Sequence, residues 1–371
     1  MRRLADQVLF RAVRLLKDRP AAFRFAKRHL ANTFVHRMAQ GATRNVDARA
    51  ASERVLQAHG IEPTAGVLAG HWDRNVARVE SKELKGWLDW EFIEVEHIRP
   101  QVSGDKAVYY LQHFFRSHLP SLPVDRALSL GCGGGNLERA LIQLEATRSV
   151  DAFDASPESI RVATELAGKE GMGERIRYAV SDINRLALEP AAYDFVIAKM
   201  SLHHFERLDH IYAEISRSLK PGGVFMFNEY VGPTRFQWTD LQLKLVNQLL
   251  QILPEKHRRS ALTGEVLREI TRPTVEEMIR MDPTEAVNSA AIIPTLSKHF
   301  EILEHKNYGG NFLHLLLNHV MANFDVEDEM QASLLRSIFL LERTLVEQKV
   351  LDSDFCFVVA RPLPGSLSSI D

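Results

Sequence analysis

The sequence predicts an α/β fold with a doubly wound, mostly parallel sheet, and three observations support this prediction. An apolar run at 127–130 stops at the glycines of 131–135, and a helical spacing of apolar residues follows. Apolar runs that alternate with helical patterns then recur as far as residue 227. An acid, Asp154, ends the second run, 23 residues after Gly131. Strands that alternate with helices in this way form parallel sheets with helices on both faces.

The glycine loop between the first strand and its helix is the first candidate binding segment. Glycine accepts positive φ angles and has no Cβ, so a ligand can approach the main chain closely. The amide groups at the start of the following helix have no partner within the helix and can bind that ligand. The helix is expected to pack on the sheet through Leu137, Ala140, Leu141 and Leu144.

The other elements of the sheet follow at regular spacing. Ser156 and Pro157 begin the helix after the second strand, with proline in its favoured first-turn position. A helix is expected at 104–116, before the first strand, and Lys220-Pro-Gly-Gly223 ends the helix before the fifth. That later helix carries an apolar stripe of Leu208, Ile211, Tyr212, Ile215 and Leu219. Further strands are expected at 150–154, 176–181, 193–199 and 224–227.

Two helical insertions are expected late in the chain, at about 234–298 and 309–350. Thr274 and Glu277 form a capping-box pattern that opens a short helix, with Met278 and Met281 on or near its apolar side. The longer helices are marked by Trp238, Leu241, Leu245, Leu249 and Leu253, by the segment 311–320, and by Met330, Leu334, Ile338, Leu341 and Leu345. The sixth and seventh strands are expected at 300–305 and 354–360. Such insertions sit at the carboxyl ends of the strands, where open sheets bind ligands.

Five segments together carry a family resemblance. In order they read LSLGCGGGNLE at 128–138, FDAS at 153–156, SDIN at 181–184, YDFVIAKMSLHHF at 193–205 and LKPGGVFMFNEY at 219–230. This order resembles a class I S-adenosylmethionine-dependent methyltransferase, of the branch with the quinone-biosynthesis and other small-molecule enzymes, over about 104–232. The resemblance implies a Rossmann-like, seven-stranded methyltransferase sheet with helices on both faces, an N-terminal helical region, and helical insertions after strands 5 and 6.

A nicotinamide dehydrogenase is the main alternative for a glycine loop of this kind. Dehydrogenases usually carry G-x-G-x-x-G. Here Gly131, Gly133 and Gly135 form G-x-G-x-G, and Asn136 stands at the third dehydrogenase glycine. That departure, together with LKPGG downstream, favours the methyltransferase.

The resemblance also implies the cofactor and the residues that bind it. S-adenosyl-L-methionine is the expected methyl donor, with S-adenosyl-L-homocysteine as the product. Asp154 would accept the ribose hydroxyls, and Asp182 the adenine amino group, with Ile183 beside the ring. In the alternative interpretation, Asp182 only caps a turn and Gly135 only permits close packing. The expected cofactor-binding residues are Gly131, Cys132, Gly133, Gly135, Asp154, Ala155, Asp182, Ile183 and Lys199.

Methyl transfer needs an acceptor held in line with the donor, and a hydroxyl acceptor also needs a base. The candidate catalytic residues are His203, His204, Glu229 and His314. Glu229 is a candidate base if its pocket raises its pKa; the alternative is a salt-bridged or solvated glutamate. The candidate substrate-binding residues are Trp72, Tyr230, Trp238 and His319. Trp72 lies in a polar and aromatic segment that is either a lid over the substrate or a contact between helices.

No metal site is predicted from the sequence. His314 and His319 are five residues apart, so on a helix they point about 140° apart and do not share a face. Helical metal motifs place their histidines four apart. His314 also lies among leucines, which is typical of a core histidine.

The length of 371 residues exceeds the ~250–300 at which one core stops growing. We expect an N-terminal helical accessory or lid region at 1–100, a methyltransferase domain at 101–362 and a flexible tail at 363–371. Cys132 and Cys356 are too few for a disulfide framework, and we expect buried thiols in a cytoplasmic protein. The sequence has no apolar run of ~18 residues and no visible secretory signal, so no transmembrane helix is expected.

The first 44 residues are strongly basic. They contain 11 Lys and Arg against two acids, Asp6 and Asp18, whereas the whole chain has a net charge of −2. Leu4, Val8, Leu9, Val13 and Leu16 share a helical face. We favour a helix that packs on the catalytic domain or on a second subunit. Peripheral contact with an anionic membrane surface is the next interpretation, and binding to nucleic acid the least favoured.

The sequence therefore predicts a methyltransferase that acts on a small or medium-sized organic acceptor. O-methylation is favoured over N-methylation, and N-methylation over C-methylation. A homodimer is one expected assembly. Two other classes stay open: a methyltransferase of RNA or protein that docks through the basic N-terminus, and a protein that binds S-adenosylmethionine without catalysis.

Overall fold

The computed structural model describes residues 86–261 and 263–364. The predictions for the basic N-terminal helices, for Trp72 and for the end of the tail lie outside these residues. The described chain forms two compact units. One comprises 86–238, 271–308 and 354–364, and the other comprises 239–270 and 309–353.

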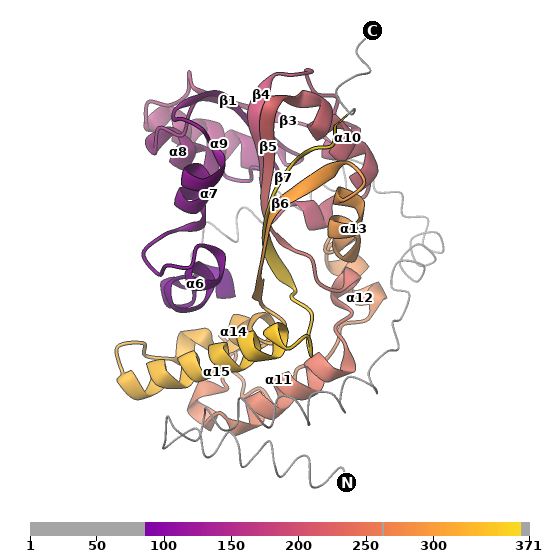
Figure 1. The fold of residues 1–371 in the computed structure, drawn as a ribbon. Helices are drawn as coiled ribbons and strands as arrows, with labels where there is room; N and C mark the ends of the chain where they lie inside the picture. The colour runs from indigo at the N-terminus through magenta and orange to yellow at the C-terminus, as the bar shows by residue number, and fades with distance from the viewer. Residues whose placement is uncertain (1–85, 262, 365–371) are drawn as a thin grey trace. The chain divides into compact units, whose positions relative to one another are not determined.

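A seven-stranded sheet is the centre of the first unit (Figure 1). Its strands lie in the order β3-β2-β1-β4-β5-β7-β6. The pairs from β3 across to β5 are parallel, whereas β7 runs antiparallel to β5. This order confirms the predicted Rossmann-like sheet. The strands are β1 (Val124–Leu130), β2 (Thr147–Asp154), β3 (Ile176–Val180), β4 (Tyr193–Lys199), β5 (Leu219–Tyr230), β6 (Phe300–Gly309) and β7 (Phe355–Pro362).

Helices connect the strands of this unit as the sequence pattern indicates. Ser156 accepts the amide hydrogen of Ser159 and so caps the helix that Pro157 begins, as predicted. Thr274 and Glu277 form the predicted capping box. The helices are α5 (Glu91–Ile93), α6 (Arg99–Val102), α7 (Tyr110–His118), α8 (Asn136–Gln143), α9 (Pro157–Lys169), α10 (Leu208–Ser218), α12 (Val275–Met281) and α13 (Ile292–Leu296).

The core of the first unit lies between the centre of the sheet and α10. Leu128, Val196 and Phe225 of neighbouring strands are fully buried. Four residues of the predicted stripe lie on α10 and pack against them, whereas the fifth, Leu219, begins β5; all five are buried. Burial of such side chains contributes about 1.5–3 kcal/mol each, which holds the carboxyl ends of β1, β4 and β5 in fixed positions.

The second unit is helical in its described residues. It contains α11 (Asp240–Ile252), α14 (Leu313–Val320) and α15 (Glu329–Glu347). The fully buried carboxylate of Glu342 on α15 accepts the amide hydrogens of Phe312 and Leu313 at the start of α14. A carboxylate in that position satisfies amides that have no partner within the helix.

Several predicted boundaries and faces were wrong. The helix before β1 begins at Tyr110 rather than 104, β6 continues to Gly309, and Lys220-Pro-Gly-Gly223 belongs to β5. Leu144 lies just after α8 and is 48% exposed, whereas Glu138 and Arg139 on this helix are buried. On α12, Met281 is 63% exposed because it ends the helix. On α15, the buried face is Ala332, Leu335, Ile338, Phe339 and Glu342, because Glu342 must reach α14.

Within the described residues, none of the helices combines the length and the apolar character needed to span a bilayer.

Candidate functional site

The glycine loop after β1 has the open backbone that the sequence predicts. Gly131, Gly133 and Gly135 have φ angles of +71°, +50° and +77°. A Cβ at Gly131 would clash with the side chain of Ser201, whereas no atom lies within 4 Å of the position of a Cβ at Gly133. Main chain that is both positive in φ and open on its outer side can receive a ligand at van der Waals distance. Gly133 therefore provides the point of close approach.

Asp154 stands beside this open segment at the end of β2. Its Oδ2 accepts the amide hydrogen of Gly133 at 2.8 Å, and its Oδ1 accepts that of Ser156 at 2.9 Å. The first bond joins the loop to the neighbouring strand end, so the carboxylate and the open main chain are held together. This combination fits a ligand that offers ribose hydroxyls.

Ser201 connects the glycine loop to a second group of polar side chains. It follows β4, and its hydroxyl donates to the carbonyl oxygen of Leu130 at 2.8 Å. The amides of Ser201 and Leu202 both donate to Oε2 of Glu229, at 2.8 and 2.7 Å. The carboxyl ends of β1, β4 and β5 are therefore linked by hydrogen bonds.

His203 and Glu229 form a buried pair at these strand ends. Nδ1 of His203 lies 2.5 Å from Oε1 of Glu229, and the two residues are 5% and 0% exposed. Burial alone would lower the pKa of His203, but the charge and the hydrogen bond of Glu229 outweigh it and raise that pKa to about 9. His203 is therefore an imidazolium near neutral pH.

The other side of the His203 ring faces Glu285. Nε2 of His203 lies 3.5 Å from Oε1 of Glu285, whose side chain keeps 24% of its surface exposed. Burial raises the pKa of Glu285, the positive charge of His203 offsets part of that rise, and Asp282 adds to it. Glu285 is thus a partly accessible carboxylate with an increased affinity for protons, which suits a general base.

A protein-family model described as "Methyltransferase domain" matches residues 128–227. The match begins in β1 and ends in β5, so it spans both the glycine loop and the His203 region. Residues 128–227 therefore carry a methyltransferase domain.

Curated relatives match less than half of the chain. A sterol 24-C-methyltransferase of Gibberella zeae is 25% identical over 144 residues, which are 39% of this chain and 38% of that protein. A sterol 24-C-methyltransferase of Candida albicans is 29% identical over 159 residues, 42% of this chain and 37% of that protein. The chain thus spans less than two fifths of the length of these relatives.

Solved structures resemble the chain more loosely. A phosphoethanolamine N-methyltransferase 2 of Haemonchus contortus is 20% identical, with a TM-score of 0.42, and covers 67% of this chain and 51% of its own. A geranyl diphosphate C-methyltransferase of Streptomyces coelicolor A3(2) is 15% identical, with a TM-score of 0.40. The match covers 67% of this chain and 78% of that protein's chain. Similarity at this level is not evidence of a shared substrate.

The other residues expected to bind the donor have varied surroundings in the methyltransferase domain. Asp182 caps a short 3-10 turn through the amide of Asn184, as the alternative interpretation predicted, so this carboxylate has a local structural role at least. Ile183 and Cys132 are buried, Ala155 is half-buried, and Lys199 is exposed at the end of β4. A Cβ at Gly135 would clash with Tyr178 and Ala163, which agrees with a packing role for this glycine.

Glu229 is held differently from a free base. Its carboxylate accepts the amides of Ser201, Leu202 and Tyr230 in addition to the His203 ring, and it is fully buried. Both oxygens of this carboxylate already accept hydrogen bonds from neighbouring groups, so a substrate has little room to reach them. Its place fits a positioning residue for His203 better than the base that the sequence suggested.

His204 and the candidate substrate-binding residues of the methyltransferase domain lie around this pair. Nδ1 of His204 lies 3.2 Å from Oγ1 of Thr284. Tyr230 is 1% exposed, and its hydroxyl donates to Pro233. Trp238 is 9% exposed and stacks on Phe236, with the ring centroids 5.2 Å apart. These two rings form part of a packed aromatic group, and their contact with a substrate stays a prediction.

His314 and His319 lie on α14, in the other compact unit. Both rings are partly buried, and burial lowers the pKa of His319. Their predicted roles are not tested by this structure.

Sequence reasoning missed three residues of the site. Glu285 and Asp282 lie in the first insertion, more than 50 residues after Glu229, and no local pattern marks them. Glu138 was missed because the helical pattern gave α8 the wrong face. It is fully buried and accepts a hydrogen bond from Ser129 of β1.

Proposed function

We propose that this protein transfers a methyl group from S-adenosylmethionine to a small or medium-sized organic acceptor. The observation that carries the proposal is the meeting of two groups at adjacent strand ends. Gly133 and Asp154 form an open cradle with a carboxylate, and His203, Glu229 and Glu285 form a polar cluster next to it. The first group fits a donor, and the second fits the handling of an acceptor proton.

The donor supplies a methyl group already activated on a sulfonium, and it leaves as a thioether. The residues of this chain have to bind it and to hold the acceptor in line with the carbon–sulfur bond. Gly131 and Gly133 offer main chain, and Asp154 accepts hydroxyls. The open space at Gly133 and the carboxylate beside it agree with this assignment.

An acceptor hydroxyl or amine must lose its proton as the new bond to carbon forms. His203 is unsuited to take that proton near neutral pH, because Glu229 keeps it protonated. Glu285 is the better base, since burial raises its pKa and part of its side chain stays accessible. The acceptor proton would pass to the Glu285 carboxylate, and the His203 imidazolium would stabilise nearby negative charge.

The acceptor class is proposed from the names of the relatives and from the candidate base. The names of the relatives, sterol 24-C-methyltransferases, support an apolar small molecule as the acceptor and support C-methylation as a further candidate reaction. A base at Glu285 supports O- or N-methylation, because a proton then leaves the methylated atom. We keep O-methylation as the first proposal and C-methylation of an isoprenoid lipid as the second. A cytoplasmic location and a homodimer remain predictions.

The test uses the full chain with labelled S-adenosylmethionine and four acceptor pools: sterols and isoprenoid lipids, phenols, amines, and a mixture of RNA and protein. We expect label in one of the three small-molecule pools. Glu285→Gln should abolish O- or N-methylation while calorimetry shows unchanged donor affinity. Label confined to RNA or protein would exclude a small acceptor. Donor binding without turnover in any pool would favour a non-catalytic binding protein.

A further inference from the structure

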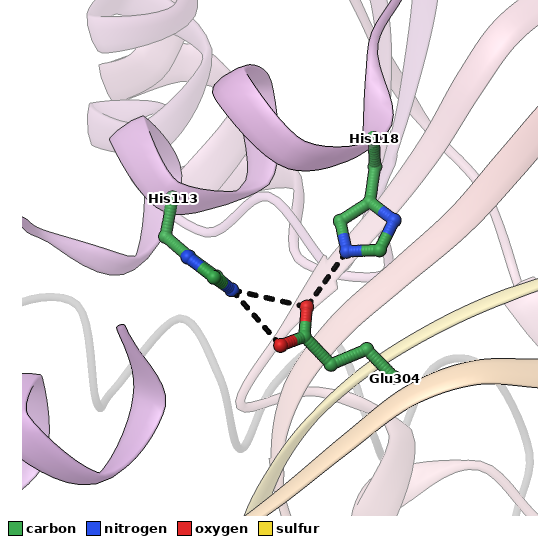
Figure 2. Close-up of side chains that lie close together, drawn as sticks. All are labelled: His113, His118 and Glu304. Atoms are coloured by element: carbon green, nitrogen blue, oxygen red, sulfur yellow. Dashed lines mark hydrogen bonds and ion pairs between the residues drawn. The ribbon is translucent and has the colours of Figure 1, made fainter. Parts of the chain in front are cut away.

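Three side chains converge at the edge of the sheet that β6 forms, opposite the β3 edge. Figure 2 shows His113 and His118 of α7 directed toward Glu304 of β6. Nε2 of His113 lies 3.0 Å from both carboxylate oxygens of Glu304, and Nε2 of His118 lies 2.7 Å from Oε2. The three ligand atoms lie within 4.8 Å of one another.

We propose that His113, His118 and Glu304 bind a divalent transition-metal ion, with zinc as the best fit. Two imidazole nitrogens and one carboxylate are a common set for zinc, which completes its shell with water. Imidazole favours zinc, copper or nickel over magnesium and calcium, which prefer oxygen ligands. A divalent cation would replace the two ring hydrogens that now face the carboxylate.

The geometry needs little adjustment to accept the ion. Zinc with bonds of about 2.0–2.1 Å keeps tetrahedral ligands about 3.3 Å apart. The nitrogen–oxygen distances of 2.7 and 3.0 Å would lengthen by about 0.6 and 0.3 Å. Side chains that are 13–17% exposed have room for that movement and leave a path for the ion.

Packing orients both rings before any ion binds. The ring of His118 stacks on Phe114, with centroids 6.2 Å apart, and the ring of His113 meets Phe357 of β7 edge-on at 5.9 Å. Phe114 and Phe357 are fully buried. Ligands supported in this way lose little freedom on binding, which is what a metal site requires of its surroundings.

The ion would have a structural or regulatory role. Glu304 lies on β6, four strand positions from β1 in the sheet, which is about 19 Å at the usual strand spacing. An ion there would join α7, which leads into β1, to the edge strand β6. Lys306 would compete with the ion for the carboxylate of Glu304, because its Nζ lies 3.5 Å from Oε1 of that residue.

The test is zinc binding to the full chain in competition with a chromophoric chelator, with the thermal midpoint as a second readout. We expect zinc to bind and to raise the midpoint by several degrees. His118→Gln and Glu304→Gln should each weaken that binding roughly 100-fold, about the share of one ligand in a four-ligand zinc site. Lys306→Gln, which removes the competing charge, should strengthen it several-fold.

The matched control is His299→Gln. His299 also pairs with a carboxylate, that of Asp209 at 3.2 Å, but it belongs to no group of three ligands within the described residues. This variant should bind zinc like the parent. Cobalt can replace zinc as a probe, and its visible spectrum should change in the parent and not in His118→Gln. Failure of the parent to compete with the chelator would overturn the proposal. So would parent-like affinity in both ligand variants, because another histidine cluster would then hold the ion.

Discussion

The Oε1 atom of Glu229 lies 2.5 Å from Nδ1 of His203, and neither side chain is more than 6% exposed. This pair links the ends of β4 and β5 and is connected to the glycine loop through Ser201. Both charged groups are buried away from water, so the loss of either partner leaves the charge of the other uncompensated.

Glu229→Gln tests the charge of this pair. We expect a loss of about 3–5 kcal/mol in the free energy of unfolding near pH 7, the cost of breaking a buried pair. The pKa of His203 should fall, because burial then acts without the opposing carboxylate. Chemical denaturation and NMR titration of the imidazole measure the two effects. An unchanged titration of His203 would contradict the assignment.

The same pair predicts how stability depends on pH. The folded pKa of His203, about 9, lies above its ordinary value of 6.5. Its contribution to stability is therefore fully present below pH 6.5 and is lost as the pH rises through about 9. The parent should show this loss, and Glu229→Gln should not. Equal slopes in the two proteins between these pH values would rule out the pair as the cause.

Glu138→Gln tests a second buried carboxyl. Burial raises the pKa of Glu138 to about 7 from 4.5, although its bond from Ser129 opposes the rise. The carboxyl group of the unfolded chain loses its proton at a lower pH, so the stability of the parent should fall by about 3 kcal/mol between pH 4.5 and 7. The glutamine variant should lack this component. Glu174→Gln, at an exposed position, should keep the slope of the parent.

Alanine substitutions in the glycine loop separate backbone strain from donor binding. Gly133→Ala should cost about 1–2 kcal/mol of stability, because φ is +50°. It should also weaken donor binding about tenfold, since the new methyl group enters the open cradle. Gly131→Ala should destabilise more, because its Cβ also meets Ser201. Gly171→Ala is the matched control: φ is +73° with nothing nearby, so it should cost similar stability and leave donor affinity unchanged.

Asp154→Ala should weaken donor binding by about 1–3 kcal/mol, the usual cost of leaving buried hydrogen-bond partners unmatched. Part of that loss comes from the amide of Gly133, which would lose its acceptor. Asp154→Asn keeps one carbonyl oxygen, so its affinity should lie between those of the alanine variant and the parent. Calorimetric affinity equal to the parent in both variants would show that this carboxylate does not hold the donor.

Much of the fold could be predicted from local pattern. The run at 193–199 coincides with β4, the stripe of α10 is buried as expected, and Ser156 and Thr274 cap their helices. These features depend on residues close in sequence, whose periodicity and capping chemistry act within one element. The predicted buried faces of α8 and α15 were wrong because each helix buries a glutamate that is hydrogen-bonded to a residue outside the helix. Hydrophobic periodicity gives no sign of such a pair.

The sequence by itself determined the class of fold, the glycine loop and the acid at the end of β2, because these follow from the order of short apolar runs and turns. Only the tertiary structure decided which polar groups meet. Glu285 faces His203 across 82 residues of chain, and Glu304 receives two histidines whose spacing of five would place them on different sides of a long helix. The packing of several elements around a shared core brings such groups together, and the spacing of residues within one element does not predict how close these groups lie.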